Sequence, residues 1–117
     1  MGNIVDELRA FGADTDEGIK RCASKEELYI KLVRKVPGDP GFSELSSCIE
    51  KSDLDAAFEQ AHRLKGSISN LSLNPLKDPI ERITESLREK QARDYSADLA
   101  KLEEERARLQ SIVETCE

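Results

Sequence analysis

The chain has 117 residues, of which 24 are acidic and 18 are basic, so its formal net charge at pH 7 is −6. This length allows one domain with a single modest core, which we place over residues 1–117. The negative charge argues against nucleic acid as the main partner. No apolar run approaches the roughly 20 residues of a membrane span, and residues 1–7 do not resemble a signal peptide. Because the three cysteines match neither a disulfide framework nor a zinc site, we expect a protein of the reducing cytoplasm.

Short helices are expected in the first third of the chain, over about residues 3–36. The first has an apolar face that ends at Gly12, and the second begins at Thr15 or Asp16. A third begins with a capping box in which Ser24 is the N-cap and Glu27 reaches back to it. The residues at 37–41, rich in proline and glycine, end this third helix. The apolar faces of the first and third helices are Ile4, Val5, Leu8 and Phe11, and Leu28, Leu32, Val33 and Val36.

Four longer helices are expected at about 41–52, 53–72, 75–92 and 95–115. Together they predict an all-α fold in which an antiparallel four-helix bundle over residues 41–115 carries the short N-terminal helices. The helical spacing of Phe42, Leu45 and Ile49 marks the first of the four. The pair Ser52-Asp53 breaks the chain and caps the second.

The third and fourth of these helices each contain an irregularity. Asn74-Pro75 reads as a cap followed by proline at the first helical position. Pro79 then either kinks this helix or begins it, and the phase of Leu76 with the later apolar residues favours a kink. Asp94 or Ser96 caps the last helix, in which Arg106 interrupts the apolar stripe and is expected to extend to solvent. The carboxylates at 103–105 are expected on a solvated face. The two stripes are Leu76, Ile80, Ile83 and Leu87, and Leu99, Leu102, Leu109, Ile112 and Val113.

The second long helix contains the single histidine of the chain, His62. At about 100° per residue, His62 lies beside the apolar stripe with its ring at least partly exposed. Gly66 follows one turn later, although a glycine within a helix costs about 0.5–1 kcal/mol relative to alanine. Residues 60–77 contain no acidic residue, which favours an anion near the ring. The stripe consists of Leu54, Phe58, Ala61, Leu64, Ile68 and Leu71.

The run from His62 to Ser67, followed by Asn70-Leu71, resembles the H-x-L-K-G-S phosphorylation motif of histidine phosphotransfer (HPt) domains. The likeness covers roughly residues 12–113. It departs from the family at Ser72, where a glycine is common, and this departure concerns the end of the helix. The resemblance implies a phosphoryl carrier in a two-component phosphorelay. His62 would accept the phosphoryl group from a receiver-domain aspartate and pass it to another receiver.

The same resemblance implies the partners, which are response-regulator receiver domains and a hybrid sensor kinase. The receiver would supply Mg²⁺, so this chain itself needs neither a metal nor a cofactor. We expect it to be a monomer. No autonomous kinase activity is expected, because no glycine-rich loop could hold ATP. A lone histidine without a close cysteine pair also argues against a triad or a metal site.

His62 is therefore the expected nucleophile, since a neutral imidazole can attack phosphorus. Lys65, one turn away, can balance the negative charge of a phosphoryl group, and Gly66 leaves room for a partner to approach. Arg63, Ser67 and Ser69 are further candidates for stabilising the phosphate or for docking. Two alternatives stay open. One is a non-catalytic helical adaptor that binds a partner through the same face, and the other is a structural bundle that self-associates.

Overall fold

A computed structural model describes residues 3–116 of the chain. Within this range the protein has seven helices and no strand, so the predicted all-α fold is confirmed. None of the helices described is both long enough and apolar enough to cross a membrane. All three cysteines are free thiols.

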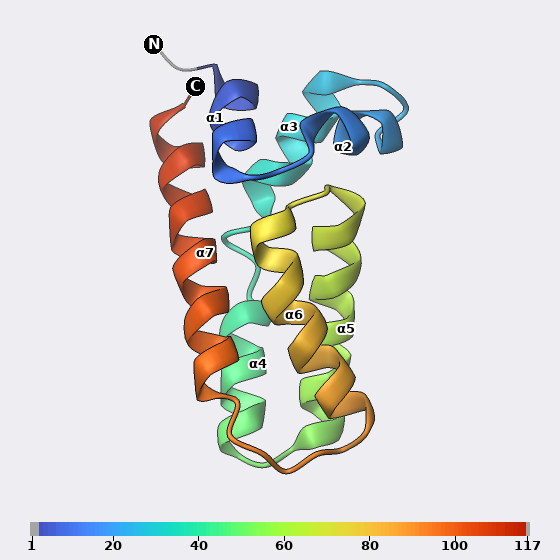
Figure 1. The fold of residues 1–117 in the computed structure, drawn as a ribbon, viewed down its shortest axis with the longest axis vertical. Helices are drawn as coiled ribbons and strands as arrows, with labels where there is room; N and C mark the ends of the chain where they lie inside the picture. Colours follow the sequence, from blue (N-terminus) through green and yellow to red (C-terminus); the bar gives the residue numbers. More distant parts are fainter. Residues whose placement is uncertain (1–2, 117) are drawn as a thin grey trace.

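Three short helices lie together at one end of the molecule (Figure 1). They are α1 (Ile4–Phe11), α2 (Thr15–Arg21) and α3 (Glu26–Lys35). The Asn3 side chain caps α1 by accepting the backbone N–H of Val5 at 2.8 Å. The helix ends as predicted at Gly12, whose φ of 117° lies in the left-handed region that glycine adopts without strain.

The start of α3 differs from the prediction. Ser24 has a φ of 60°, so it belongs to the sharp turn after α2 and cannot have the extended backbone of an N-cap. The N-cap position is Lys25, which has no side-chain capping bond. The buried face of α3 is also rotated from the one expected. Tyr29 and Val33 are buried, whereas Leu28 is 39% exposed, because the Tyr29 hydroxyl reaches inward to donate to the Leu71 carbonyl at 2.9 Å.

Four further helices follow and lie along the long axis of the molecule (Figure 1). They are α4 (Gly41–Glu50), α5 (Leu54–Asn70), α6 (Asn74–Arg88) and α7 (Ser96–Thr115). Each packs against the next in sequence, and α1 packs against α7. Their apolar faces form the centre of the core, in which the largest fully buried side chains include Leu45, Leu64, Ile68, Leu76, Ile80, Ile83, Leu87 and Leu109.

Several helix boundaries were predicted to within one or two residues. Asp53 caps α5 as expected, by accepting the N–H of Ala56 at 3.2 Å. Helix α6 begins before Pro79 and continues through it. Its N-cap is residue 73 rather than the predicted Asn74. The N-cap of α7 is Tyr95 rather than either of its neighbours, although Asp94 does accept the N–H of Ser96 at 2.8 Å.

Helix α7 carries a buried carboxylate that the prediction of a solvated face missed. Glu105 is only 2% exposed, because it continues the buried face of α7 between Leu102 and Leu109. Its charge is balanced by Arg108, at 2.8 Å, and by Lys101, at 3.2 Å. Arg106 does not extend freely into solvent either. It pairs with Glu103, and its Nη1 donates to the carbonyl of Pro37 at 3.0 Å.

Candidate functional site

Helix α5 presents His62 to solvent on the side away from the core. The side chains of α5 that are fully buried are Ala57, Ala61, Leu64 and Ile68. At about 100° per residue, these four centre the buried face well over a quarter-turn from His62. The His62 residue is accordingly exposed. Phe58, predicted to lie in the buried stripe, is instead half-buried at the edge of the core on the His62 side.

The rings of Phe58 and His62 are stacked. Their centroids are 5.6 Å apart and their planes differ by 20°. The two residues are four positions apart on one helix, so their side chains lie on the same face of α5. The guanidinium of Arg88, which comes from α6, lies 5.6 Å from the centroid of the Phe58 ring. The motif from His62 to Ser67 contains neither Phe58 nor Arg88, and only the i, i+4 spacing to His62 could have indicated Phe58.

Lys65 leans from α5 toward α6. Its Nζ lies 3.9 Å from Oε1 of Glu85, and the same oxygen lies 3.5 Å from Nη2 of Arg88. One carboxylate is therefore shared by two cations on the α6 flank of His62. The Lys65 side chain is 28% exposed and the Glu85 side chain 59%, so both are accessible to an approaching molecule.

Gly66 is exposed and has free space around it. A Cβ atom added at this position would meet nothing within 4 Å outside its own helix backbone. Gly18, in α2, is the opposite case. There a Cβ would collide with the ring of Tyr29 and would lie 2.8 Å from the Leu71 carbonyl oxygen. Close packing thus requires glycine at position 18 and does not require it at position 66.

Arg63 is turned away from His62, about 100° further round α5. It forms two hydrogen bonds with Asp39, each of 2.9 Å, and so ties α5 to the segment between α3 and α4. The bond from the Arg63 guanidinium holds the pKa of the Asp39 carboxyl below its usual range, and the N–H of Gly41, 2.7 Å from Oδ1, acts in the same direction. The structure therefore does not bring Arg63 together with His62.

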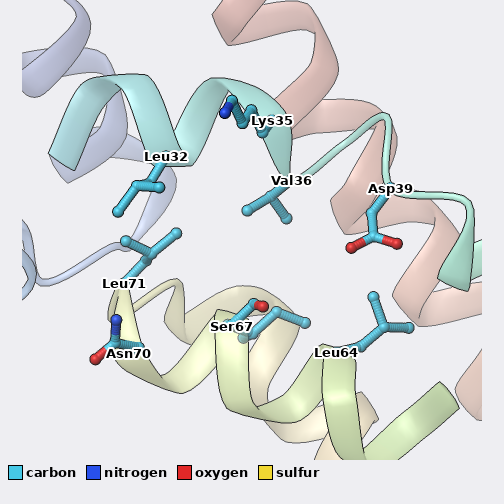
Figure 2. Close-up of a pocket in the computed structure, with 9 residues that line it drawn as sticks. Leu32, Lys35, Val36, Asp39, Leu64, Ser67, Asn70 and Leu71 are labelled. Carbon is cyan, nitrogen blue, oxygen red and sulfur yellow. The ribbon is translucent and has the colours of Figure 1, made fainter. Parts of the chain in front are cut away.

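Ser67 lies on the same flank as Arg63, along a groove of about 210 Å³ between α3 and α5. In Figure 2, Leu32 of α3 and Val36, which follows the last residue of α3, face Leu64 and Leu71 across this groove. The walls are therefore mainly apolar, and the charged groups lining it are Lys35 and Asp39. Ser69 is not among the lining residues.

The C-terminal end of α5 is tied to the N-terminal helices. Arg21 donates to the Ser69 carbonyl at 2.8 Å, and the Tyr29 hydroxyl donates to the Leu71 carbonyl. The N–H of Asp14 donates to the carbonyl of Ser72 at 3.0 Å. These bonds give partners to carbonyls at and just beyond the end of α5, of which the Ser69 carbonyl also accepts the N–H of Ser72 at 3.1 Å. Ser72 itself has a φ of 53°, so a backbone conformation suited to glycine is kept at this turn by a serine.

No group of three or more His, Cys, Asp or Glu residues within residues 3–116 is placed to hold a metal ion. Among the sequence-predicted site residues, the structure puts Lys65 and Gly66 on the exposed side of α5 with His62. Arg63 and Ser67 lie on the flank toward α3, and Ser69 lies one turn beyond Lys65.

Comparison with known protein families gives one match. The family model described as Hpt domain matches residues 5–112, a range that begins in α1, ends in α7 and includes His62. No curated protein and no solved structure matches the chain.

Proposed function

Because this chain belongs to the Hpt domain family, we propose that His62 is its phosphoacceptor and that it carries phosphoryl groups between receiver domains. Histidine phosphotransfer within two-component phosphorelays is the general activity of the family, whose members interact with receiver and kinase domains. The observation that carries the assignment is the exposure of His62, the only histidine of the chain, on α5 beside a glycine with open space around it.

The proposed reaction is one phosphoryl transfer. The lone pair of an imidazole nitrogen of His62 attacks the phosphorus of a receiver's aspartyl phosphate. The N–P bond forms while the P–O bond breaks, and the electron pair of that bond leaves with the aspartate carboxylate. The other imidazole nitrogen keeps its proton throughout. The reverse reaction, with a second receiver, passes the phosphoryl group on.

The two proteins contribute different parts of this chemistry. The receiver would supply the aspartate and Mg²⁺, which stabilises the transferring group. This chain would supply a positioned nucleophile, the charge of Lys65 and the open approach over Gly66. Arg63 and Ser67, on the flank of α5 toward α3, and Ser69 would contribute to docking rather than to the transfer itself. A hybrid sensor kinase would feed the relay, and the chain would act as a monomer in the cytoplasm.

The proposal includes an antiparallel four-helix bundle made of α4 to α7, with α1 to α3 across one end. Short connections between successive helices and the packing of each against the next support this arrangement. Such a bundle is a rigid support, which a positioned nucleophile requires.

The test is incubation with a panel of phosphorylated receiver domains, followed by assay for an acid-labile, base-stable phosphoryl label on this protein. The wild type should take the label. The His62→Gln variant should fold normally, since His62 is exposed, and should take none. Label on the variant would show that another residue is the acceptor. If the wild type binds receivers without accepting label from any of them, the adaptor alternative is supported instead.

A further inference from the structure

The carboxylate of Glu85 pairs with Lys65, which lies one helical turn from His62. The phosphoryl group that we propose for His62 has the same negative charge as this carboxylate. Glu85 Oε1 lies 3.9 Å from the Lys65 ammonium and 3.5 Å from the Arg88 guanidinium. Lys65 is one helical turn from His62, and Arg88 lies against the Phe58 ring that stacks on His62. Lys65 and Arg88 are thus engaged by the same acid.

We propose that Glu85 competes with the phosphoryl group of His62 for Lys65 and Arg88, and thereby limits how strongly this protein holds phosphate. The inference rests on the proposed role of His62. In the unphosphorylated protein, Glu85 keeps both cations paired. The phosphoryl group on His62 itself carries nearly two negative charges, so Lys65 and Arg88 are then shared between two anions that repel each other.

This competition suits a carrier, which must release what it accepts. A site in which both cations bound only the phosphoryl group would favour phosphohistidine over the return of phosphate to a receiver. Glu85 makes the phosphorylated state less favourable without blocking the ring. The side chains of Glu85 and Arg88 are 59% and 50% exposed, so solvent screens the effect and keeps it modest.

The test needs no receiver. Phosphoramidate, a small-molecule phosphoryl donor, is used to phosphorylate the folded wild type and the Glu85→Gln variant. Urea unfolding is then measured for each protein with and without the phosphoryl group. For Glu85→Gln, phosphorylation should favour the folded state by about two- to fivefold more in the unfolding equilibrium than it does for wild type, in line with exposed ion pairs. The difference should shrink at high salt.

Two further variants separate this effect from a general change in net charge. Glu81→Gln removes a charge one turn earlier on the same helix, and Glu81 has no ion pair within the described part of the chain. It should behave like wild type. In a Lys65→Met background, which keeps the apolar stem but removes the cation, the effect of Glu85→Gln should be reduced. An equal effect from Glu81→Gln, or an undiminished effect without Lys65, would overturn the inference.

A second measurement separates this inference from the proposed function. With a competent receiver, the equilibrium between phospho-receiver and phosphohistidine should move toward His62 by the same factor in Glu85→Gln. If the chemical test succeeds but no receiver transfers phosphate, the relay role fails and the competition stands. If receivers transfer phosphate and the chemical test shows no coupling, the competition alone fails. If phosphoramidate does not label His62, the receiver measurement decides both: no label from any receiver overturns the relay role, and an unmoved equilibrium in Glu85→Gln overturns the competition.

Discussion

The ring of Phe58 lies stacked on the ring of His62, with centroids 5.6 Å apart and planes inclined by 20°. Stacking of two aromatic rings contributes about 0.5–1.5 kcal/mol of favourable interaction energy beyond that from burying apolar area. It also limits the orientations open to an exposed imidazole, which otherwise rotates freely in solvent. We therefore expect Phe58 to position the ring of the proposed nucleophile.

Phe58→Leu tests this relationship, because leucine keeps most of the apolar volume and removes the aromatic face. Phosphotransfer onto His62 should become about two- to fivefold slower, because the ring loses about 0.5–1 kcal/mol of the stacking energy that holds its orientation. The free energy of unfolding should change by less than about 1.5 kcal/mol. Transfer rates and urea unfolding curves check both statements. Transfer at the full rate by a stable Phe58→Leu protein would show that the stack does not position the ring.

The open space at Gly66 gives a second prediction. Gly66→Ala should be stabilised by up to about 1 kcal/mol and should transfer phosphate almost normally. Gly66→Gln should be equally well folded but severely slowed, because its side chain would cross the face of His62. Gly66→Glu should be slower still, since it adds a negative charge beside an incoming phosphoryl group.

Gly18→Ala provides the contrast for this series. The Cβ of alanine would collide with the Tyr29 ring and the Leu71 carbonyl. The free energy of unfolding of Gly18→Ala should therefore fall by about 1–3 kcal/mol. Thermal melting and transfer rates of all four variants separate the two kinds of glycine. If Gly66→Gln melted far below wild type, access to the ring would not be the reason for glycine there.

Asp39, which pairs with Arg63, carries a third prediction. Asp39→Asn should lower the free energy of unfolding by about 1–2 kcal/mol near neutral pH, because it weakens hydrogen bonds to a charged partner. The Arg63 bond lowers the pKa of Asp39 in the folded protein. The stabilisation is therefore complete above the ordinary aspartate pKa of about 3.9 and is lost as pH falls through the lower, folded value.

Urea unfolding near neutral pH and at about pH 3 measures this dependence. The difference between wild type and Asp39→Asn should shrink at the lower pH. Asp16→Asn is the control, because the pair between Asp16 and Arg9 has one hydrogen bond rather than two and is far more exposed, at 84% for the Asp16 side chain against 21% for Asp39. A loss as large in Asp16→Asn would mean that neither the second hydrogen bond nor the burial of the Asp39 pair matters.

Tyr29 provides a fourth prediction, at the opposite end of the pH scale. Burial, followed by the nearby Cys22 and Asp14, raises its pKa to about 12. The folded state thus holds the phenolic proton more tightly than the unfolded state does. Its contribution to stability is full below the ordinary tyrosine pKa of about 10 and falls as pH rises from there toward 12.

Tyr29→Phe should lower stability by about 1–2 kcal/mol near neutral pH, because the buried Leu71 carbonyl loses its donor. The variant should also lose less stability than wild type between about pH 8 and pH 11. Urea unfolding and ultraviolet absorption of tyrosinate report these two effects. An identical alkaline loss in wild type and variant would assign it to other groups.

Periodicity and breakers predicted the helices well, because each apolar stripe repeats at three and four residues and because Asp53 and Gly12 mark ends through their own backbone chemistry. What failed depended on tertiary contacts. Leu28 and Tyr29 both fit a buried face of α3, and the choice between them is made by a carbonyl 42 residues away. Ser24 is a good N-cap residue by type, but the turn after α2 imposes a left-handed backbone on it.

In the candidate site, too, features within one helix were predictable from the sequence, whereas contacts between helices were not. His62, Lys65 and Gly66 lie on one helix, so spacing alone places them on its exposed side. Glu85 and Arg88 come from α6, and no pattern within α5 could indicate them. The burial of Glu105 is similar in kind, since its cations at i+3 and i−4 are visible in the sequence but the inward direction of that face is not.

The hydrogen bonds of Arg34 span more of the chain than any other side-chain bonds within residues 3–116. Its guanidinium donates to the carbonyls of Val113 and Cys116, 79 and 82 residues later, at 2.8 Å each. Contacts between such distant residues form late in folding, because closing a long loop costs conformational entropy before any contact is gained. Helices α4, α5 and α6 are joined by short turns, so we expect them to meet early. We therefore expect the His62 helix to pack first against its neighbours α4 and α6. The contacts between the N-terminal and C-terminal parts of the chain should form last.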